Sequence, residues 1–292
     1  EALARARWEH DWRGLGRARL GAAAETPLDG ARRADDEGTN TGGGGAATTK
    51  GAGLVFVVGM HKTGTTSLRD ALAKLGYNVF QLKVGGADPV KTCFRAGAYP
   101  RETEAVMFNR RARRQLLACL DRHGIFSRFD AFQDTPFYGL ATELADLFPA
   151  AKFVYMTRPL DEWYESAHAH FTNPRAVAWS QKQAVVYANG TWGPGDVLDA
   201  FHGVMYGANH GTPRDDADRA VWMAGFGLQS RELMTRFAKA DDDRLLFMDL
   251  HAGDGYDVLA PFLGRPYAAN WTFPHDNVHG VWKRGKRGRT TV

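Results

Sequence analysis

The chain has 292 residues, of which 44% are hydrophobic and 24% are charged, a composition typical of a globular protein with a substantial core. Its net charge is +4, a mild basic excess that suits an anionic ligand and does not require a nucleic acid partner. No apolar run approaches the roughly 20 residues that a membrane-spanning helix needs, so no membrane segment is predicted.

The N-terminal part of the chain differs in composition from the rest. From residue 21 to residue 53 the sequence is mostly Ala, Gly, Thr and Asp, and it includes four consecutive glycines, Gly42–Gly45. Such a segment buries too little apolar surface to offset the entropy lost on ordering. We therefore predict a flexible Gly/Ala-rich N-terminal segment over residues 1–51, followed by one folded domain over residues 52–292.

Three features bear on the cellular location. The sequence begins at Glu1 rather than Met, which leaves an N-terminal signal or anchor open. Its two cysteines, Cys93 and Cys119, are either two free thiols or one bridge, so no disulfide framework is indicated. Two triplets, at Asn189 and Asn270, have the N-glycosylation pattern. The cytoplasm and the Golgi lumen therefore stay open as alternative locations.

The most informative segment is the first apolar run and the turn that follows it. Leu54–Val58 is typical of a buried parallel strand, and a turn from Gly59 to Gly64 leads from it into a helix. Backbone N–H groups and the helix dipole converge at such a helix start, so we expect the turn to bind phosphate. A nucleotide-triphosphate loop has its lysine directly after the second glycine. Here Thr65 takes that position and Lys62 lies two residues before Gly64, so the cation is aimed differently.

Strands and helices alternate along the rest of the chain. The predicted strands are Tyr77–Leu82, Ala151–Thr157 and Leu245–Asp249, and the predicted helices are Arg101–Arg122, Val221–Lys239, Asp254–Leu263 and one that Pro159 opens. This alternation predicts an α/β fold with a central parallel sheet flanked by helices, the three-layer arrangement of P-loop NTPases. Four arginines of the helix before residue 122 are expected to form a solvated face: Arg110, Arg111, Arg113 and Arg114.

A second candidate anion contact follows the strand at Ala151–Thr157. Arg158 closes this strand, and Ser166 lies eight residues later on the next helix. The carboxyl end of a parallel strand is where open α/β sheets bind ligands. A guanidinium grips a phosphate with two parallel hydrogen bonds, and a serine hydroxyl adds another donor. The alternative is a structural ion pair between Arg158 and Asp161 or Glu162.

With both segments in view, the chain resembles the sulfotransferases that use 3′-phosphoadenosine 5′-phosphosulfate (PAPS). The 5′-phosphate loop of that family typically reads Lys-[Ser/Thr]-Gly-Thr-Thr, matched here by Lys62–Thr66, and its 3′-phosphate site is matched by Arg158 and Ser166. The resemblance covers roughly residues 52–280 and is closest to the broad P-loop group described simply as a sulfotransferase domain. It implies transfer of a sulfuryl group from PAPS to a hydroxyl or amine of a small molecule or glycan, without a metal ion.

The resemblance also implies a role for each loop residue. Lys62 would contact the 5′-phosphate and the oxygen that bridges it to sulfur, where negative charge builds as the S–O bond breaks. The same phosphate would be held by residues of the loop and the helix start: Thr63, Gly64, Thr65, Thr66 and Ser67. Arg158 and Ser166 would bind the 3′-phosphate, which distinguishes this nucleotide from ATP. The alternative for the loop residues is a plain helix cap.

The candidate general base is found at a position where the chain departs from the pattern of the soluble sulfotransferases. The soluble aryl and steroid sulfotransferases have a histidine just before the strand that leads to the 3′-phosphate site, whereas this chain has Asp134 there. Asp134 is therefore the candidate base, with a helix N-cap ahead of Pro136 as the competing interpretation and His61 as a minor alternative base. The soluble enzymes also clamp the 3′-phosphate with a C-terminal Arg-Lys-Gly stretch, to which only Lys283–Gly288 is comparable here, in a different order.

Two other functions stay open on the sequence alone. The Gly59-to-Gly64 spacing and a Walker-B-like run, Leu245–Asp249, favour a P-loop kinase or NTPase, against which stands Thr65 in place of the Walker lysine. The second alternative is a non-catalytic nucleotide-binding module that keeps the fold. No spacing of histidines and carboxylates indicates a metal site.

Overall fold

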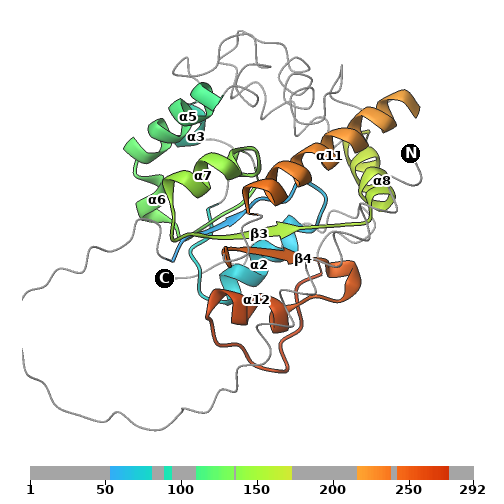
Figure 1. Ribbon diagram of the computed structural model, residues 1–292. Coiled ribbons are helices and arrows are strands. Elements are labelled where there is room, and N and C mark those ends of the chain that lie inside the picture. Colours follow the sequence, from blue (N-terminus) through green and yellow to red (C-terminus); the bar gives the residue numbers. More distant parts are fainter. Residues whose placement is uncertain are drawn as a thin grey trace, which may run out of the picture. The chain divides into compact units, whose positions relative to one another are not determined.

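The computed structural model describes residues 53–80, 89–93, 110–134, 136–172, 216–237 and 242–275 (Figure 1). The chain divides into two units, Glu1–Thr48 and Thr49–Val292, and all of the described residues belong to the second. The predicted flexible segment over residues 1–51 and the basic stretch Lys283–Gly288 lie outside the described residues.

Within the described ranges, four parallel strands form one sheet in the order β2-β1-β3-β4. They are β1 (Val55–Val57), β2 (Ala131–Phe132), β3 (Lys152–Met156) and β4 (Leu245–Met248). The register places Phe56 beside Phe132 on one side and Phe153 on the other, and the three rings stack with centroids 5.2 and 5.5 Å apart. The all-parallel sheet with flanking helices confirms the predicted α/β fold class.

Helices pack on both faces of this sheet, because successive strand residues point to opposite sides (Figure 1). One face carries α2 (Thr65–Lys74) and α12 (Tyr256–Leu263), whose leucines join Val55 and Val57 in one buried cluster. Phe56 points to the other face, into a second buried cluster. That face is covered by α5 (Arg110–Arg122), α6 (Ile125–Arg128), α7 (Ala141–Leu147) and α11 (Asp216–Arg236).

The remaining elements connect strands to this layer. Helix α8 (Leu160–Phe171) follows β3 and packs on α11, where the rings of Trp163 and Phe226 lie 4.6 Å apart. Short elements complete the described chain: α3 (Pro89–Cys93), η2 (Phe137–Leu140) and η3 (Leu250–Ala252). Every helix start predicted here is found within a few residues, except that residues 101–109 of the expected helix Arg101–Arg122 lie outside the described ranges.

The strand predicted over Tyr77–Leu82 is wrong. Within residues 77–80 only Val79 pairs, in an isolated parallel bridge with Ala131. The N–H of Phe80 donates to the Ala131 carbonyl at 2.8 Å, so this segment runs beside β2 without forming a longer ladder. The named strand at that edge is β2, whose two residues are too few to show a periodic pattern in the sequence.

One arginine of the predicted solvated face points inward. Arg113 Nε lies 2.9 Å from Glu143 Oε1, and both side chains are largely buried. Burial raises the pKa of Glu143, and the charge of Arg113 opposes that shift. Arg113 precedes the buried Leu116 by three residues, which puts both on the inward face of α5. The prediction is therefore wrong for Arg113, whereas Arg111 and Arg114 are exposed as expected.

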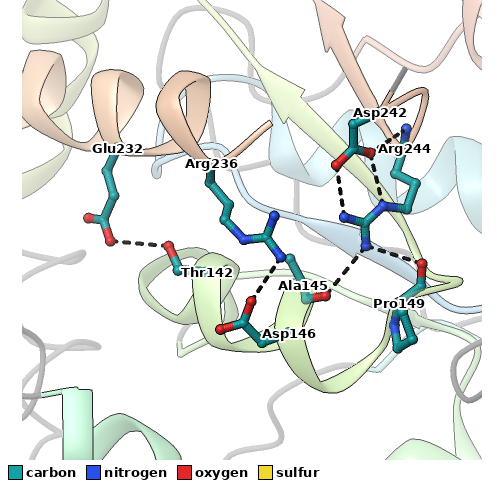
Figure 2. Close-up of polar contacts among 8 residues, drawn as sticks. All are labelled: Thr142, Ala145, Asp146, Pro149, Glu232, Arg236, Asp242 and Arg244. Atoms are coloured by element: carbon teal, nitrogen blue, oxygen red, sulfur yellow. Dashed lines mark hydrogen bonds and ion pairs between the residues drawn. The ribbon is translucent and has the colours of Figure 1, made fainter. Parts of the chain in front are cut away.

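Helix α7, which follows β2, is held by polar contacts on two sides (Figure 2). Arg236 of α11 donates to Asp146 Oδ1 at 2.8 Å. Arg244, just before β4, donates to the Ala145 carbonyl at 3.4 Å and is itself held by Asp242 through hydrogen bonds of 2.9 and 2.8 Å. These contacts connect α7 to α11 and to the segment that leads into β4, and so help to stabilise the arrangement of helices on this face of the sheet.

Cys93 in α3 and Cys119 in α5 form a disulfide, which decides between the two alternatives for the cysteines. We expect the double variant Cys93→Ser, Cys119→Ser to lose about 3 kcal/mol of unfolding free energy, because the bridge removes the closure entropy of a loop of this length from the unfolded chain. The two cysteines are 26 residues apart in the sequence. Chemical denaturation of both proteins measures the difference.

The control for this prediction is a reductant. It should destabilise the wild type by the same amount and leave the double variant unchanged. Two titratable thiols in the unfolded wild type, without any reductant, would argue against the bridge.

Candidate functional site

The strand order brings the candidate residues to one edge of the sheet. Parallel strands end at the same edge, and residues just beyond that edge are where such sheets bind ligands. In the order β2-β1-β3-β4, Asp134 follows β2, His61 and Lys62 follow β1, and Arg158 follows β3. Asp249 follows β4 and completes the row. Residues that are far apart in the sequence therefore become neighbours.

Two glycines shape the turn between β1 and α2. A Cβ on Gly59 would lie 2.7 Å from the Met156 carbonyl oxygen, so only glycine allows the turn to pass this close to β3. Gly64 has a φ of 105° and stands at the N-cap of α2. The helix begins at Thr65, so the first orphan N–H groups of α2 belong to the predicted loop residues.

The side chains of this turn divide into two groups. The Thr63 hydroxyl is buried and donates to the Met60 carbonyl at 2.6 Å, so it stabilises the turn itself. Ser67 is also buried, whereas Lys62, Thr65 and Thr66 are partly exposed. For Thr63 and Ser67, a contact with phosphate would therefore come from the backbone N–H group.

The segment after β3 holds two successive carbonyls of the turn. Arg158 Nη1 donates to the Lys62 carbonyl at 3.2 Å, and Trp163 Nε1 donates to the His61 carbonyl at 2.9 Å. Trp163 is fully buried, so the start of α8 is anchored against the turn. The two candidate anion contacts, Lys62 and Arg158, thus lie side by side. Ser166 lies two turns along α8 from Arg158 and is partly exposed.

The electrostatics of these two cations favour an anionic partner. Burial lowers the pKa of Lys62, the charge of Arg158 lowers it further, and Asp134 opposes the shift. Burial also lowers the pKa of Arg158, with Glu162 and Asp249 opposing. An anionic group beside each side chain would stabilise its charged form.

Asp134 and His61, the two candidate bases, contact each other. His61 Nε2 lies 3.0 Å from Asp134 Oδ1, with 19% of the first side chain and 48% of the second exposed. The ring of His61 also packs edge-on against Tyr138, with centroids 4.7 Å apart. Among the described non-glycine residues, positive φ occurs at Lys62 (68°) and Asp134 (64°). Backbone strain of this kind is typical of functional sites.

The pKa of His170 responds to the charges of the candidate site residues, a link that the sequence pattern does not reveal by itself. Burial lowers the pKa of His170 to about 4, and the charges of Lys62 and His61 add to that shift, whereas Asp134 opposes it. The available signal is its position four residues after Ser166, on the same face of α8. Because its pKa is so low, His170 is neutral near neutral pH.

Comparison with known proteins identifies the family. A family model described as a sulfotransferase domain matches residues 54–282. The chain belongs to the sulfotransferase-domain family. The matched region includes all of the site residues from His61 to Asp249, which confirms the resemblance drawn from the two short motifs. Among curated proteins, no match was found.

Two further features of the sulfotransferase domain concern membrane-spanning helices and groups of metal ligands. Among its described helices, none has both the length and the apolar character needed to cross a membrane. Among the described residues, Cys93, Cys119 and His123 lie close enough together to hold a metal ion. The sulfur atoms of both cysteines are bonded to each other in the disulfide. Cys93 and Cys119 lie on α3 and α5, and His123 directly follows α5, so the group lies in elements that do not contribute to the candidate site.

Proposed function

We propose that this sulfotransferase domain transfers a sulfuryl group from PAPS to a hydroxyl or amine of a small molecule or glycan, leaving adenosine 3′,5′-bisphosphate (PAP). Membership of the sulfotransferase-domain family supports sulfotransferase activity. The observation that supports PAPS as the donor is the hydrogen bond of Arg158 to the Lys62 carbonyl, because it joins two cation sites within reach of one nucleotide. A nucleotide with separate 5′ and 3′ anionic groups fits such a pair.

In this proposal each cation has one phosphate. Lys62 and the N–H groups at the start of α2 bind the 5′-phosphate, and Lys62 also faces the oxygen that leaves sulfur. Arg158 and Ser166 bind the 3′-phosphate. The reaction is a direct in-line displacement without a covalent enzyme intermediate. The transferred sulfuryl group carries less charge than a γ-phosphoryl group, so the proposal needs no metal ion.

The acceptor's proton goes to the pair formed by Asp134 and His61. A lone exposed carboxylate is a weak base, but the imidazole of His61 lies 3.0 Å from the Asp134 carboxylate, so the two side chains can act on the proton together. Asp134 is the more exposed member and therefore the one that faces an acceptor. The acceptor oxygen or nitrogen then attacks sulfur as its proton moves to the pair.

Calorimetric titration tests the donor. We expect PAP to bind at least about tenfold more tightly than ATP with Mg²⁺, because PAP makes one additional charge-assisted hydrogen bond through its 3′-phosphate. The free energy of such a bond corresponds to about a tenfold change in the dissociation constant. Tighter binding of ATP with Mg²⁺ would favour a kinase or NTPase instead.

Transfer of labelled sulfate from PAPS to a panel of carbohydrates, phenols, lipids and peptides identifies the acceptor class. No transfer to any of them would favour a non-catalytic binding module.

A further inference from the structure

The carboxylate of Glu162 contacts two basic side chains at the proposed 3′-phosphate site. Its Oε2 lies 3.7 Å from Arg158 Nε and 3.3 Å from His251 Nδ1. Glu162 and Arg158 belong to the segment after β3, whereas His251 belongs to η3, directly after β4. Groups from two neighbouring strand ends therefore meet at one oxygen atom.

The position of His251 is fixed by its own turn. The Asp249 carboxylate accepts hydrogen bonds from the N–H groups of His251 and Ala252, at 2.9 and 3.3 Å. Leu250, the residue before His251, packs against the phosphate turn so closely that a Cβ on Gly64 would lie 2.8 Å from its Cδ1. His251 is thus held on an element that touches the phosphate turn.

The contacts of Glu162 are weak enough to be replaced. The side chains of Glu162 and His251 are 51% and 42% exposed, and exposed ion pairs contribute little. Arg158 is only 22% exposed, and its buried Nε makes no hydrogen bond within the described residues, since 3.7 Å is too long for one. A buried N–H without a hydrogen bond is unfavourable, so a closer anion would be preferred at this point.

We propose that His251 is a further ligand of the nucleotide's 3′-phosphate, and that the Glu162 carboxylate takes the place of this phosphate in the nucleotide-free protein. The inference rests on the proposed function, because it assigns residues to the same nucleotide site. When the nucleotide binds, its phosphate replaces the carboxylate between Arg158 and His251, and Glu162 turns to solvent. A nucleotide without a 3′-phosphate leaves the ion pairs in place. His251 and Glu162 together therefore favour binding of adenosine nucleotides that carry a 3′-phosphate.

Calorimetric titration with PAP and with adenosine 5′-phosphate (AMP), which lacks the 3′-phosphate, tests this exchange. We expect His251→Gln to weaken PAP binding about tenfold, because a charge-assisted hydrogen bond is lost. Glu162→Gln should strengthen PAP binding about threefold, because the competing anion is removed. Neither change should alter AMP binding. Glu165→Gln is the matched control, since Glu165 lies on the same helix and pairs with Arg219 at 3.4 Å instead.

A second measurement needs no variant. The imidazole ¹⁵N resonances of His251 should shift when PAP is added and stay unchanged when AMP is added. If the wild type binds PAP no more tightly than AMP, the proposed two-phosphate site itself is wrong. If the wild type prefers PAP but both variants keep that preference and the His251 resonances do not move, the inference fails while the proposed function stands.

Discussion

Turnover of the Lys62→Ala variant is expected to be about 10²- to 10³-fold lower than that of the wild type, with the fold intact. Negative charge builds on the oxygen between phosphorus and sulfur as the S–O bond breaks, and the Lys62 ammonium stabilises that charge more in the transition state than in bound PAPS. The loss should therefore fall mainly on kcat. Steady-state transfer from PAPS and calorimetric binding of PAP measure the two effects separately.

The backbone of the phosphate turn should survive this substitution. Lys62 has a φ of 68°, which alanine adopts about as readily as lysine because both carry a Cβ atom. The hydrogen bond from Arg158 is made to the Lys62 carbonyl, which alanine also provides. Arg69→Ala, which removes another cation from α2, is the control and should keep the wild-type rate. A Lys62→Ala enzyme that loses only PAP affinity would mean that Lys62 binds the nucleotide without assisting bond cleavage.

The phosphate turn and Arg158 could be predicted from the sequence because their signals are local. A buried apolar run, a glycine turn and a helix start occupy consecutive residues from Leu54 to Leu68, and Arg158 likewise comes directly after a strong strand pattern. Each pattern predicts the local structure without reference to the rest of the fold. The same reasoning predicted the fold class, because it requires only that strands and helices alternate.

Lateral neighbours could not be predicted in this way. A one-dimensional pattern does not indicate which strand lies beside which, and the pairing of Asp134 with His61 depends on β2 lying beside β1. The two residues of β2 are too few to show a period, whereas the pattern of Tyr77–Leu82 predicted a strand of which residues 77–80 form only an isolated bridge. Arg113 shows the same limit, because its partner Glu143 is 30 residues away in the chain and lies on another helix.

The contact between Asp134 and His61 leads to the second large effect. We expect Asp134→Asn and His61→Gln each to lower kcat by about 10²- to 10⁴-fold, the usual contribution of a positioned general base. If the two side chains act as one unit, the double variant should be no slower than the slower single variant. Asparagine tolerates the left-handed backbone that Asp134 adopts, with its φ of 64°, so the turn should keep its shape.

The pH dependence of turnover separates this pair from the other groups nearby. The pair accepts a proton only when it is not already protonated, so wild-type turnover should fall as the pH decreases. His170 cannot produce this decrease above about pH 5, because burial lowers its pKa to about 4 and it is already neutral there. An Asp134→Asn enzyme with a wild-type rate would exclude the carboxylate as part of the base, and PAP binding at wild-type affinity in that variant would show that the nucleotide site is intact.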